Sequence, residues 1–296
     1  MKQLLILSGK GGTGKTTAAA AFIAFSRCRA FADCDVDAPN LHLAMPHMKE
    51  TGRADYQGFD KAFINKDLCV QCGRCQKLCR YHAITVPEVD PYACEGCGVC
   101  AEICPSRAIE MKKHVSGFLM LNRGQNQVLS TACLQMGSGA TGKLVTAVKR
   151  QLLKEAGNED IVIIDGSPGI GCPVIASISG VDMVLIVTEP SVSGMHDMQR
   201  ILNTSASFGV ACAVLINKCE VNQERVKEIE TYCQDRNIPL AGKILYDETV
   251  VRAVNSCKTM ADYPDSLAGK ALSSAWHVVC DILLKGGDRA CALRPS

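Results

Sequence analysis

A glycine-rich loop near the start of the chain constrains its fold more than any other segment. Residues 2–7 form a short apolar run that predicts a buried strand, and the alanine-rich residues 18–25 predict a helix. Between them lies the motif G-x-x-x-x-G-K-T, followed by one more threonine: Gly9, Lys10, Gly11, Gly12, Thr13, Gly14, Lys15, Thr16 and Thr17. A strand, such a loop and a helix in this order are typical of a site where backbone N–H groups surround a nucleotide phosphate. We expect Lys15 to neutralise phosphate charge and Thr16 to offer its hydroxyl to Mg2+.

Acidic residues follow two further apolar runs. Asp33, Asp35 and Asp37 come at the end of one predicted strand, and Asp165 ends the run at residues 161–164. Two more apolar runs, at residues 183–187 and 213–216, also have the length of buried strands. These elements predict a doubly wound, mostly parallel α/β sheet, whose strands end beside the glycine loop. We expect Asp165 to bind Mg2+ there.

The motif details resemble one known family. The lysine directly after the first glycine (K-G-G-T-G-K-T) and the pattern D-x-D-x-x-x-x-N-L from residue 33 are similar to those of the MinD/ParA superfamily of deviant Walker A ATPases, which includes the nitrogenase iron protein. The resemblance implies ATP as the nucleotide and a homodimer that forms on ATP binding. It also implies that Lys10 reaches the partner's nucleotide, that Asp35 orients the attacking water, and that Asn217 contacts the base. Residue 220 is Glu, so the guanine signature N-K-x-D is incomplete.

Eight of the 18 cysteines form two runs with the same spacing, C-x2-C-x2-C-x3-C, repeated after 25 residues. This spacing is similar to that of bacterial two-cluster ferredoxins, in which three cysteines of one run and the last of the other bind each 4Fe-4S cluster. The expected sets are Cys69, Cys72, Cys75 and Cys104 for the first cluster, and Cys94, Cys97, Cys100 and Cys79 for the second. Zinc is the alternative, because C-x2-C pairs also build tetrahedral zinc sites. Arg80 follows the first run, where the second run has Pro105.

The order of these motifs predicts an interrupted ATPase domain. We expect residues 1–64 to be its first part, residues 65–114 an inserted small α+β ferredoxin domain, and residues 115–296 its second part. This order resembles MinD-superfamily ATPases with an inserted ferredoxin domain.

Composition excludes some classes of partner. A net charge of +2 gives no strong field for nucleic acid. The absence of a signal sequence or of 18 consecutive apolar residues predicts a cytoplasmic protein, and we expect the apolar stripe at residues 272–284 to pack in the core rather than on a membrane.

Cys172 is spaced from Asp165 like a cluster ligand of the nitrogenase iron protein, but residues 137–143 offer no companion cysteine.

The favoured hypothesis is therefore a Mg2+-dependent ATPase that dimerises on ATP. It would couple the nucleotide cycle to electron transfer through two 4Fe-4S clusters, to or from a partner metalloprotein. Two alternatives stay open. One is a spatial organiser like MinD or ParA with redox-sensing clusters, and the other is an iron-sulfur scaffold or carrier.

Overall fold

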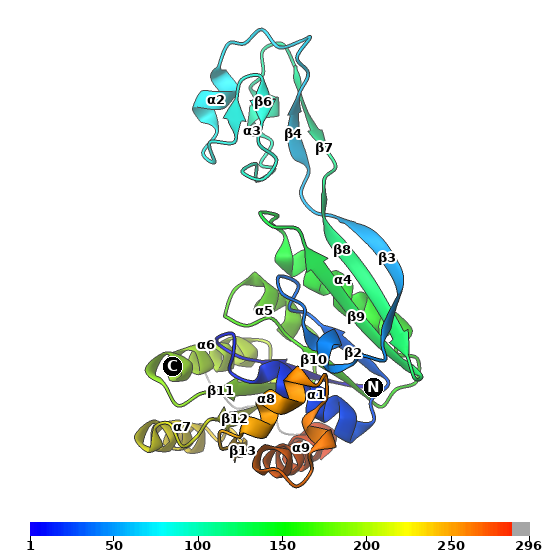
Figure 1. The fold of residues 1–296 in the computed structure, drawn as a ribbon. Helices are drawn as coiled ribbons and strands as arrows, with labels where there is room; N and C mark the ends of the chain where they lie inside the picture. Colours follow the sequence, from blue (N-terminus) through cyan, green and yellow to red (C-terminus); the bar gives the residue numbers. More distant parts are fainter. Residues whose placement is uncertain (286–296) are drawn as a thin grey trace.

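The computed structural model describes residues 1–285, most of which form one twisted sheet with helices on both faces (Figure 1). Within these residues the sheet has nine strands, in the order β13 (Leu240–Ile244), β12 (Ala211–Asn217), β11 (Met183–Thr188), β1 (Lys2–Leu7), β10 (Ile161–Asp165), β2 (Ala30–Asp33), β9 (Gln127–Leu134), β8 (Val115–Gly124) and β3 (Lys49–Gln57). The strands from β13 to β9 are parallel, and β8 and β3 are antiparallel at one edge. The predicted doubly wound, mostly parallel sheet is confirmed.

Helices cover both faces of this sheet and bury its apolar side chains. One face carries α4 (Thr141–Glu155), α5 (Cys172–Ile178), α6 (Val192–Ser207) and α7 (Gln223–Asp235). The other face carries α1 (Lys15–Ser26), α9 (Leu267–Lys285), α8 (Glu248–Asn255) and the 3-10 turns η1 (Leu41–Ala44) and η2 (Met260–Asp262). Because the central strands are covered on both sides, β1 and β10 to β12 are almost continuously apolar.

Helix α9 belongs to this core. By length and composition it is the one described helix that could cross a membrane. Its stripe Leu272, Trp276, Val279 and Leu283 is nevertheless buried against α1 and β13, and the Trp276 ring lies 5.2 Å from that of Phe22. The expectation that this stripe packs in the core is confirmed.

Strand β3 lies in a polar, glycine-containing stretch of the sequence, in which no apolar run predicts a strand. It pairs with β8 along its whole length and forms the sheet edge, so nearly all of its side chains are exposed. Charged residues on an edge strand discourage pairing with other chains. They also remove the alternation of apolar and polar residues by which a strand is recognised.

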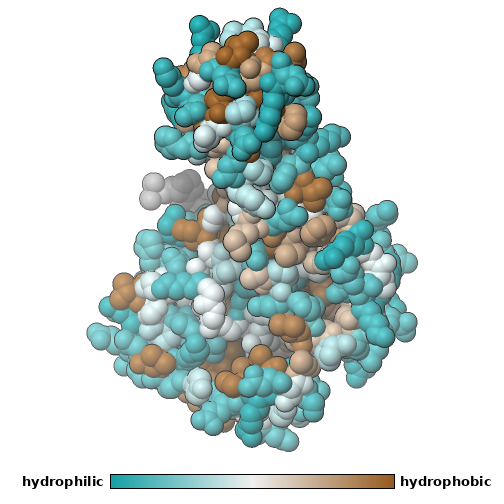
Figure 2. Space-filling model, turned by 45° about the horizontal axis from the view of Figure 1, so that its top comes forward, coloured by the Kyte–Doolittle hydropathy of each residue, from teal (hydrophilic) through white to brown (hydrophobic). Residues whose placement is uncertain are grey.

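Residues 61–112 form a separate small lobe, which we call the cysteine lobe (Figure 1). It contains two short antiparallel pairs, β4 (Lys61–Ile64) with β7 (Ile109–Lys112) and β5 (Ile84–Thr85) with β6 (Glu88–Val89), and the helices α2 (Arg74–Leu78) and α3 (Val99–Glu102). Its own core consists of Ala62, Ile64, Cys75, Ala83, Ile84, Cys94 and Ile109. Figure 2 shows the lobe projecting from the body, with apolar side chains among the polar ones on its surface. Two short segments, residues 58–60 and 113–114, join it to β3 and β8.

Candidate functional site

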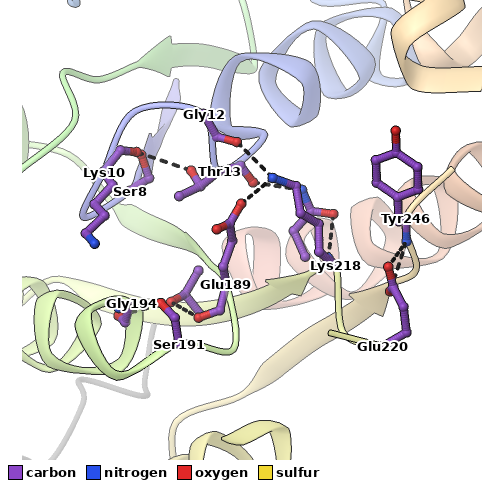
Figure 3. Close-up of polar contacts among 12 residues, drawn as sticks. Ser8, Lys10, Gly12, Thr13, Glu189, Ser191, Gly194, Lys218, Glu220 and Tyr246 are labelled. Carbon is purple, nitrogen blue, oxygen red and sulfur yellow. Dashed lines mark hydrogen bonds and ion pairs between the residues drawn. The ribbon is translucent and has the colours of Figure 1, made fainter. Parts of the chain in front are cut away.

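In the glycine loop between β1 and α1, the backbone conformation at two positions favours glycine. Gly12 and Gly14 have φ angles of 81° and 93°, in the left-handed region that other residues avoid. A Cβ on Gly14 would also lie 2.5 Å from Nδ2 of Asn217, at the end of β12. The Ser8 hydroxyl donates to the Lys10 carbonyl at 2.8 Å, which fixes the first half of the loop (Figure 3).

Lys15, Thr16 and Asp165 meet at the floor of the site. The Lys15 ammonium lies 2.6 Å from Oδ1 of Asp165, and the Thr16 hydroxyl donates to Oδ2 of Asp165 at 2.7 Å. Lys15 is 6% exposed and Asp165 is fully buried. Burial lowers the pKa of Lys15, but the charges of Asp165 and Asp33 outweigh burial, so this pKa lies above its usual value. The ammonium is therefore held charged next to the predicted Mg2+ ligands.

Asp33 organises the chain that follows β2. It stands beside Asp165 in the sheet register. Its Oδ2 accepts the backbone N–H groups of Asn40 and Leu41 at 2.8 and 2.9 Å, and its Oδ1 accepts that of Asp35 at 3.0 Å. Burial, with the charge of Asp165 adding to it, raises the pKa of Asp33 to about 7. Asp33 thus holds the shape of the acidic segment, a role that its position at a strand end did not reveal.

Asp35 lines a cavity next to the glycine loop. The cavity has a volume of about 480 Å³, a size typical of small-molecule sites. Most of the predicted loop lines it: Lys10, Gly11, Gly12, Gly14, Lys15, Thr16 and Thr17. Gly9 instead packs against Asp197 of α6, and Thr13 is buried with its carbonyl accepting from Asn217. Burial raises the pKa of Asp35, and the nearby charge of Lys15 opposes this effect.

Asn217 and Lys218 tie the end of β12 to the glycine loop. Nδ2 of Asn217 donates to the Thr13 carbonyl at 2.7 Å, so its amide stabilises the loop. Lys218 forms an ion pair with Glu189 at 2.5 Å and reaches the Gly12 carbonyl at 3.4 Å (Figure 3). No sequence motif indicates this ion pair, because Glu189 follows β11 and Lys218 follows β12.

Lys10 lies at the rim of the cavity. Its side chain is exposed and donates a hydrogen bond to the hydroxyl of Ser193, near the start of α6. Ser191 caps this helix by accepting from the N–H of Gly194 at 3.0 Å. In a single chain, Lys10 therefore contacts α6, and its role across a dimer stays a prediction.

In the cysteine lobe, the first predicted set of cysteines surrounds one small cavity. Cys69, Cys72, Cys75 and Cys104 all line it. The backbone N–H of Ala108 lies 3.3 Å from Sγ of Cys104, in position to donate to the sulfur. Burial raises the pKa of Cys75, and the neighbouring Cys69 and Cys104 add to the increase.

The second predicted set shares the lobe core. Burial raises the pKa of Cys100, with smaller contributions from Cys94 and Cys97 that reflect their proximity. Cys79 packs against the same core and accepts the N–H of Ala83 at 3.4 Å. Within residues 1–285, no group of three or more His, Cys, Asp or Glu side chains is placed to hold a single metal ion.

The fold and the cavity define a P-loop nucleotide-binding protein. The family described as "CobQ/CobB/MinD/ParA nucleotide binding domain" matches residues 4–260, so the chain belongs to this family. An uncharacterized protein of Methanocaldococcus jannaschii is 33% identical over 87% of this chain and 94% of its own length. The septum site-determining protein MinD of Buchnera aphidicola is 27% identical over 91% of this chain and 87% of its own.

Solved structures show the same fold. MinD of Pyrococcus horikoshii, complexed with Mg-ADP, superposes with a TM-score of 0.57 at 17% identity, covering 97% of this chain and 99% of that one. The McdA(D38A)–ATP complex of Cyanothece superposes with a TM-score of 0.56 at 19% identity, covering 96% of each chain. The predicted membership of the MinD/ParA-like ATPase family is confirmed. The iron-sulfur clusters and the electron transfer stay predictions, which rest on the spacing of the two cysteine runs.

Proposed function

We propose that the protein is a Mg2+-dependent ATPase that forms a homodimer when ATP binds. One observation carries this proposal: Lys15 and Thr16, which line the cavity, both lie within hydrogen-bonding distance of the buried Asp165. Lys15 would move from Asp165 to the phosphates. The solved MinD and McdA complexes with ADP and ATP support the choice of adenine nucleotide.

The residues at the floor fit Mg2+. A threonine hydroxyl and a carboxylate are the hard oxygen ligands that Mg2+ prefers, and Thr16 and Asp165 already lie 2.7 Å apart. When bound, Mg2+ would neutralise charge on the β- and γ-phosphates. Asp35 faces the same cavity and would orient the attacking water, while Lys10 at the rim would reach the nucleotide of a second subunit.

We further propose that the cysteine lobe binds two 4Fe-4S clusters. The cavity bordered by the four cysteines of the first set supports this assignment, as do the backbone N–H groups directed at Cys79 and Cys104. A cubane binds each cysteine to a different iron atom, so its sulfur ligands need not converge as closely as those of a single ion. When bound, the clusters would supply one-electron transfer.

A chain of contacts connects the lobe with the nucleotide site. Residues 136–143, which we call the bridging loop, comprise the last residues before α4 and the first three residues of that helix. The Lys143 ammonium lies 4.7 Å above the ring of Phe59, in the segment that enters the lobe. A Cβ on Gly139 would lie 3.4 Å from Oε2 of Glu95, which is next to Cys94. The bridging loop therefore packs directly on the part of the lobe that carries the second cysteine set.

The other end of the bridging loop faces the nucleotide side. A Cβ on Gly142 would lie 3.3 Å from the carbonyl oxygen of Cys172, the first residue of α5. Residues 166–171 connect Cys172 to Asp165, the predicted Mg2+ ligand. A shift of this segment on nucleotide binding would thus reach the lobe through two sets of packed atoms. We propose that the nucleotide cycle gates electron transfer to or from a redox or metallocluster protein in the cytoplasm.

A spatial organiser like MinD is the second candidate. The similarity to septum site-determining proteins over most of the chain favours it, and in that case the lobe would sense redox state. The two functions differ in their partners, a metalloprotein in one case and a septal or membrane-bound protein in the other.

The test is an anaerobic pull-down from an extract of the source organism, with the Asp35→Ala variant and Mg-ATP as bait. Asp35→Ala should bind ATP but hydrolyse it slowly, which prolongs the ATP-bound state. A metalloprotein captured with Mg-ATP, but not with Mg-ADP, supports gated electron transfer. Capture of a septal protein instead favours the organiser.

A further inference from the structure

Lys61, the first residue of β4, is a buried cation inside the cysteine lobe. Its side chain is 6% exposed, whereas Lys66, Lys77 and Lys112 of the same lobe are exposed. The Lys61 ammonium donates a hydrogen bond to the carbonyl oxygen of Cys94. Within residues 1–285 it forms no ion pair, and the lysines of the lobe that do form one are Lys66 and Lys112. The buried charge of Lys61 therefore has a carbonyl dipole beside it and no carboxylate.

The other buried lysines of the described chain are better compensated. Lys15 is paired with the carboxylate of Asp165 at 2.6 Å. Lys149 donates to the carbonyl oxygens of Ser177 and Ser179, both at 2.6 Å, at the C-terminal end of α5, where the helix dipole is negative. A charge removed from water is costly unless an opposite charge compensates it. The surroundings of Lys61 thus lack the negative group that such a position requires.

The position of Lys61 in the lobe assigns it to one set of cysteines. Cys94 belongs to the second predicted set. Ile64, at the other end of β4, lines the cavity bordered by the first set, and Lys61 does not. Three residues along a strand span about 10 Å. Lys61 therefore lies beside the second set and away from the first, at the end of β4 where the chain enters the lobe (Figure 1).

We propose that Lys61 is the counter-charge of the second 4Fe-4S cluster and selectively raises its reduction potential. This inference rests on the proposed clusters and deepens their role. A cubane bound by four thiolates is an anion, and a reduced cubane carries one more negative charge. A buried ammonium beside it stabilises the reduced form more than the oxidised form, because the interaction acts through a medium of low polarity. The neighbouring Glu95 is exposed, so solvent and salt screen its opposing charge.

The redox step that this charge favours is the transfer of one electron. The electron leaves the proposed redox partner, which is oxidised, and reduces the cluster, and no ligand bond forms or breaks. The second set also lies on the side of the lobe that contacts the body. A Cβ on Gly96 would lie 2.3 Å from the carbonyl oxygen of Asp60, and Glu95 contacts the bridging loop. Lys61 therefore favours the electron on the cluster that is closer to the nucleotide-binding body.

The experiment is an EPR-monitored redox titration of the anaerobically purified full chain, with dithionite as the reductant. Lys61→Met keeps the length of the side chain and removes its charge. It should lower the equilibrium constant for reduction of one cluster about tenfold, which is about 59 mV for one electron. Lys61→Gln can still donate to the Cys94 carbonyl and should show the same decrease, because the charge and not the hydrogen bond is responsible. Lys61→Arg should keep most of the wild-type potential.

Two further samples identify the affected cluster and the specificity of the effect. Cys104→Ser retains the complete second set, so the shift caused by Lys61→Met should persist in this background. Lys112→Met is the matched control, because Lys112 lies opposite Lys61 in the pairing of β4 with β7 but its ammonium is exposed over the ring of Phe63. It should leave both potentials nearly unchanged. Iron and sulfide analysis shows whether each variant retains both clusters.

Unchanged potentials in Lys61→Met, or wild-type potentials in Lys61→Gln, would overturn the inference and leave the proposed clusters intact. A shift confined to the first cluster would also overturn it. Loss of the second cluster in the Met and Gln variants, with retention in Lys61→Arg, would support the counter-charge. Loss in all three would assign Lys61 to packing of the lobe and overturn the inference. Wild-type protein without 4Fe-4S clusters would overturn the inference and the proposed clusters together, while ATP hydrolysis by the same sample tests the ATPase separately.

Discussion

The Lys143 ammonium lies over the ring of Phe59, 4.7 Å from its centroid, and joins the nucleotide-binding body to the entrance of the cysteine lobe. Lys143 lies in the first turn of α4, which packs against α5, and Phe59 lies in one of the two segments that carry the lobe. This pair is therefore placed to transmit a movement of the nucleotide site.

Phe59→Ala should weaken this transmission. In the wild-type protein we expect Mg-ATP to change amide hydrogen exchange in residues 90–97 of the lobe. An exposed cation–π contact contributes about 0.5–1 kcal/mol, so its loss should reduce the ATP-dependent change by roughly two- to fivefold. Phe63→Ala is the control, because the Phe63 ring contacts Lys112 within the lobe. An undiminished ATP response in Phe59→Ala would show that the bridging loop is not the route.

Lys15→Ala and Lys10→Ala should fail in different steps. Lys15 lies at the floor of the cavity, so its loss removes a charged contact to phosphate and should weaken ATP binding roughly ten- to hundredfold. Lys10 lies at the rim, and Lys10→Ala should still bind ATP but not dimerise with it. Nucleotide titration and light scattering measure the two effects. Identical behaviour of the two variants would argue against a role of Lys10 across the dimer.

Asp33 should make the nucleotide-free protein less stable as the pH rises toward neutrality. Its folded-state pKa of about 7 lies above its usual value of 3.8, so between these values the folded chain binds more protons than the unfolded chain. The free energy of unfolding should therefore fall by up to about 1.4 kcal/mol per pH unit from this group. Urea unfolding from pH 4.5 to 7.5 should show a smaller decrease for Asp33→Asn than for the control Asp37→Asn. Equal slopes would contradict the protonation assigned to Asp33.

The cysteine pairing predicts which cluster each substitution removes. Anaerobically purified protein should contain about eight iron and eight sulfide per chain. Cys104→Ser should lose the cluster of the first set, although Cys104 belongs to the second run, and Cys79→Ser should lose the other. Cys257→Ser, at an exposed cysteine outside the lobe, should change neither. Iron and sulfide analysis with EPR measures the outcome. Stoichiometric zinc in place of iron would refute the assignment.

The strands that carry the site could be predicted because both of their faces are covered. Strands β1 and β10 to β12 are continuous apolar runs, and the residues at their ends followed directly from the sequence. Strand β3 escaped prediction because an exposed edge strand needs no apolar face. Its pairing with β8 depends on a partner more than 50 residues away in the chain.

Within the site, the predictable residues were those belonging to a local motif. The spacing from Gly9 to Thr17 placed Lys15 and Thr16 at the cavity floor, where the structure has them. Lys218 and Glu189, which form an ion pair, come from the ends of two different strands, β12 and β11. They meet only because the sheet brings these ends together, so no short pattern marks them.

The most direct test of the central claim is an EPR-monitored redox titration of the proposed 4Fe-4S clusters. The nucleotide-free protein is compared with the ATP-bound Asp35→Ala variant, with nucleotide-free Asp35→Ala as the control for the substitution. Allosteric coupling of typical strength predicts that ATP shifts at least one cluster potential by about 40–130 mV. By reciprocity, reduced and oxidised protein should differ in ATP affinity by the same free energy. Superimposable titration curves with equal ATP affinities would contradict coupled electron transfer and favour the spatial organiser.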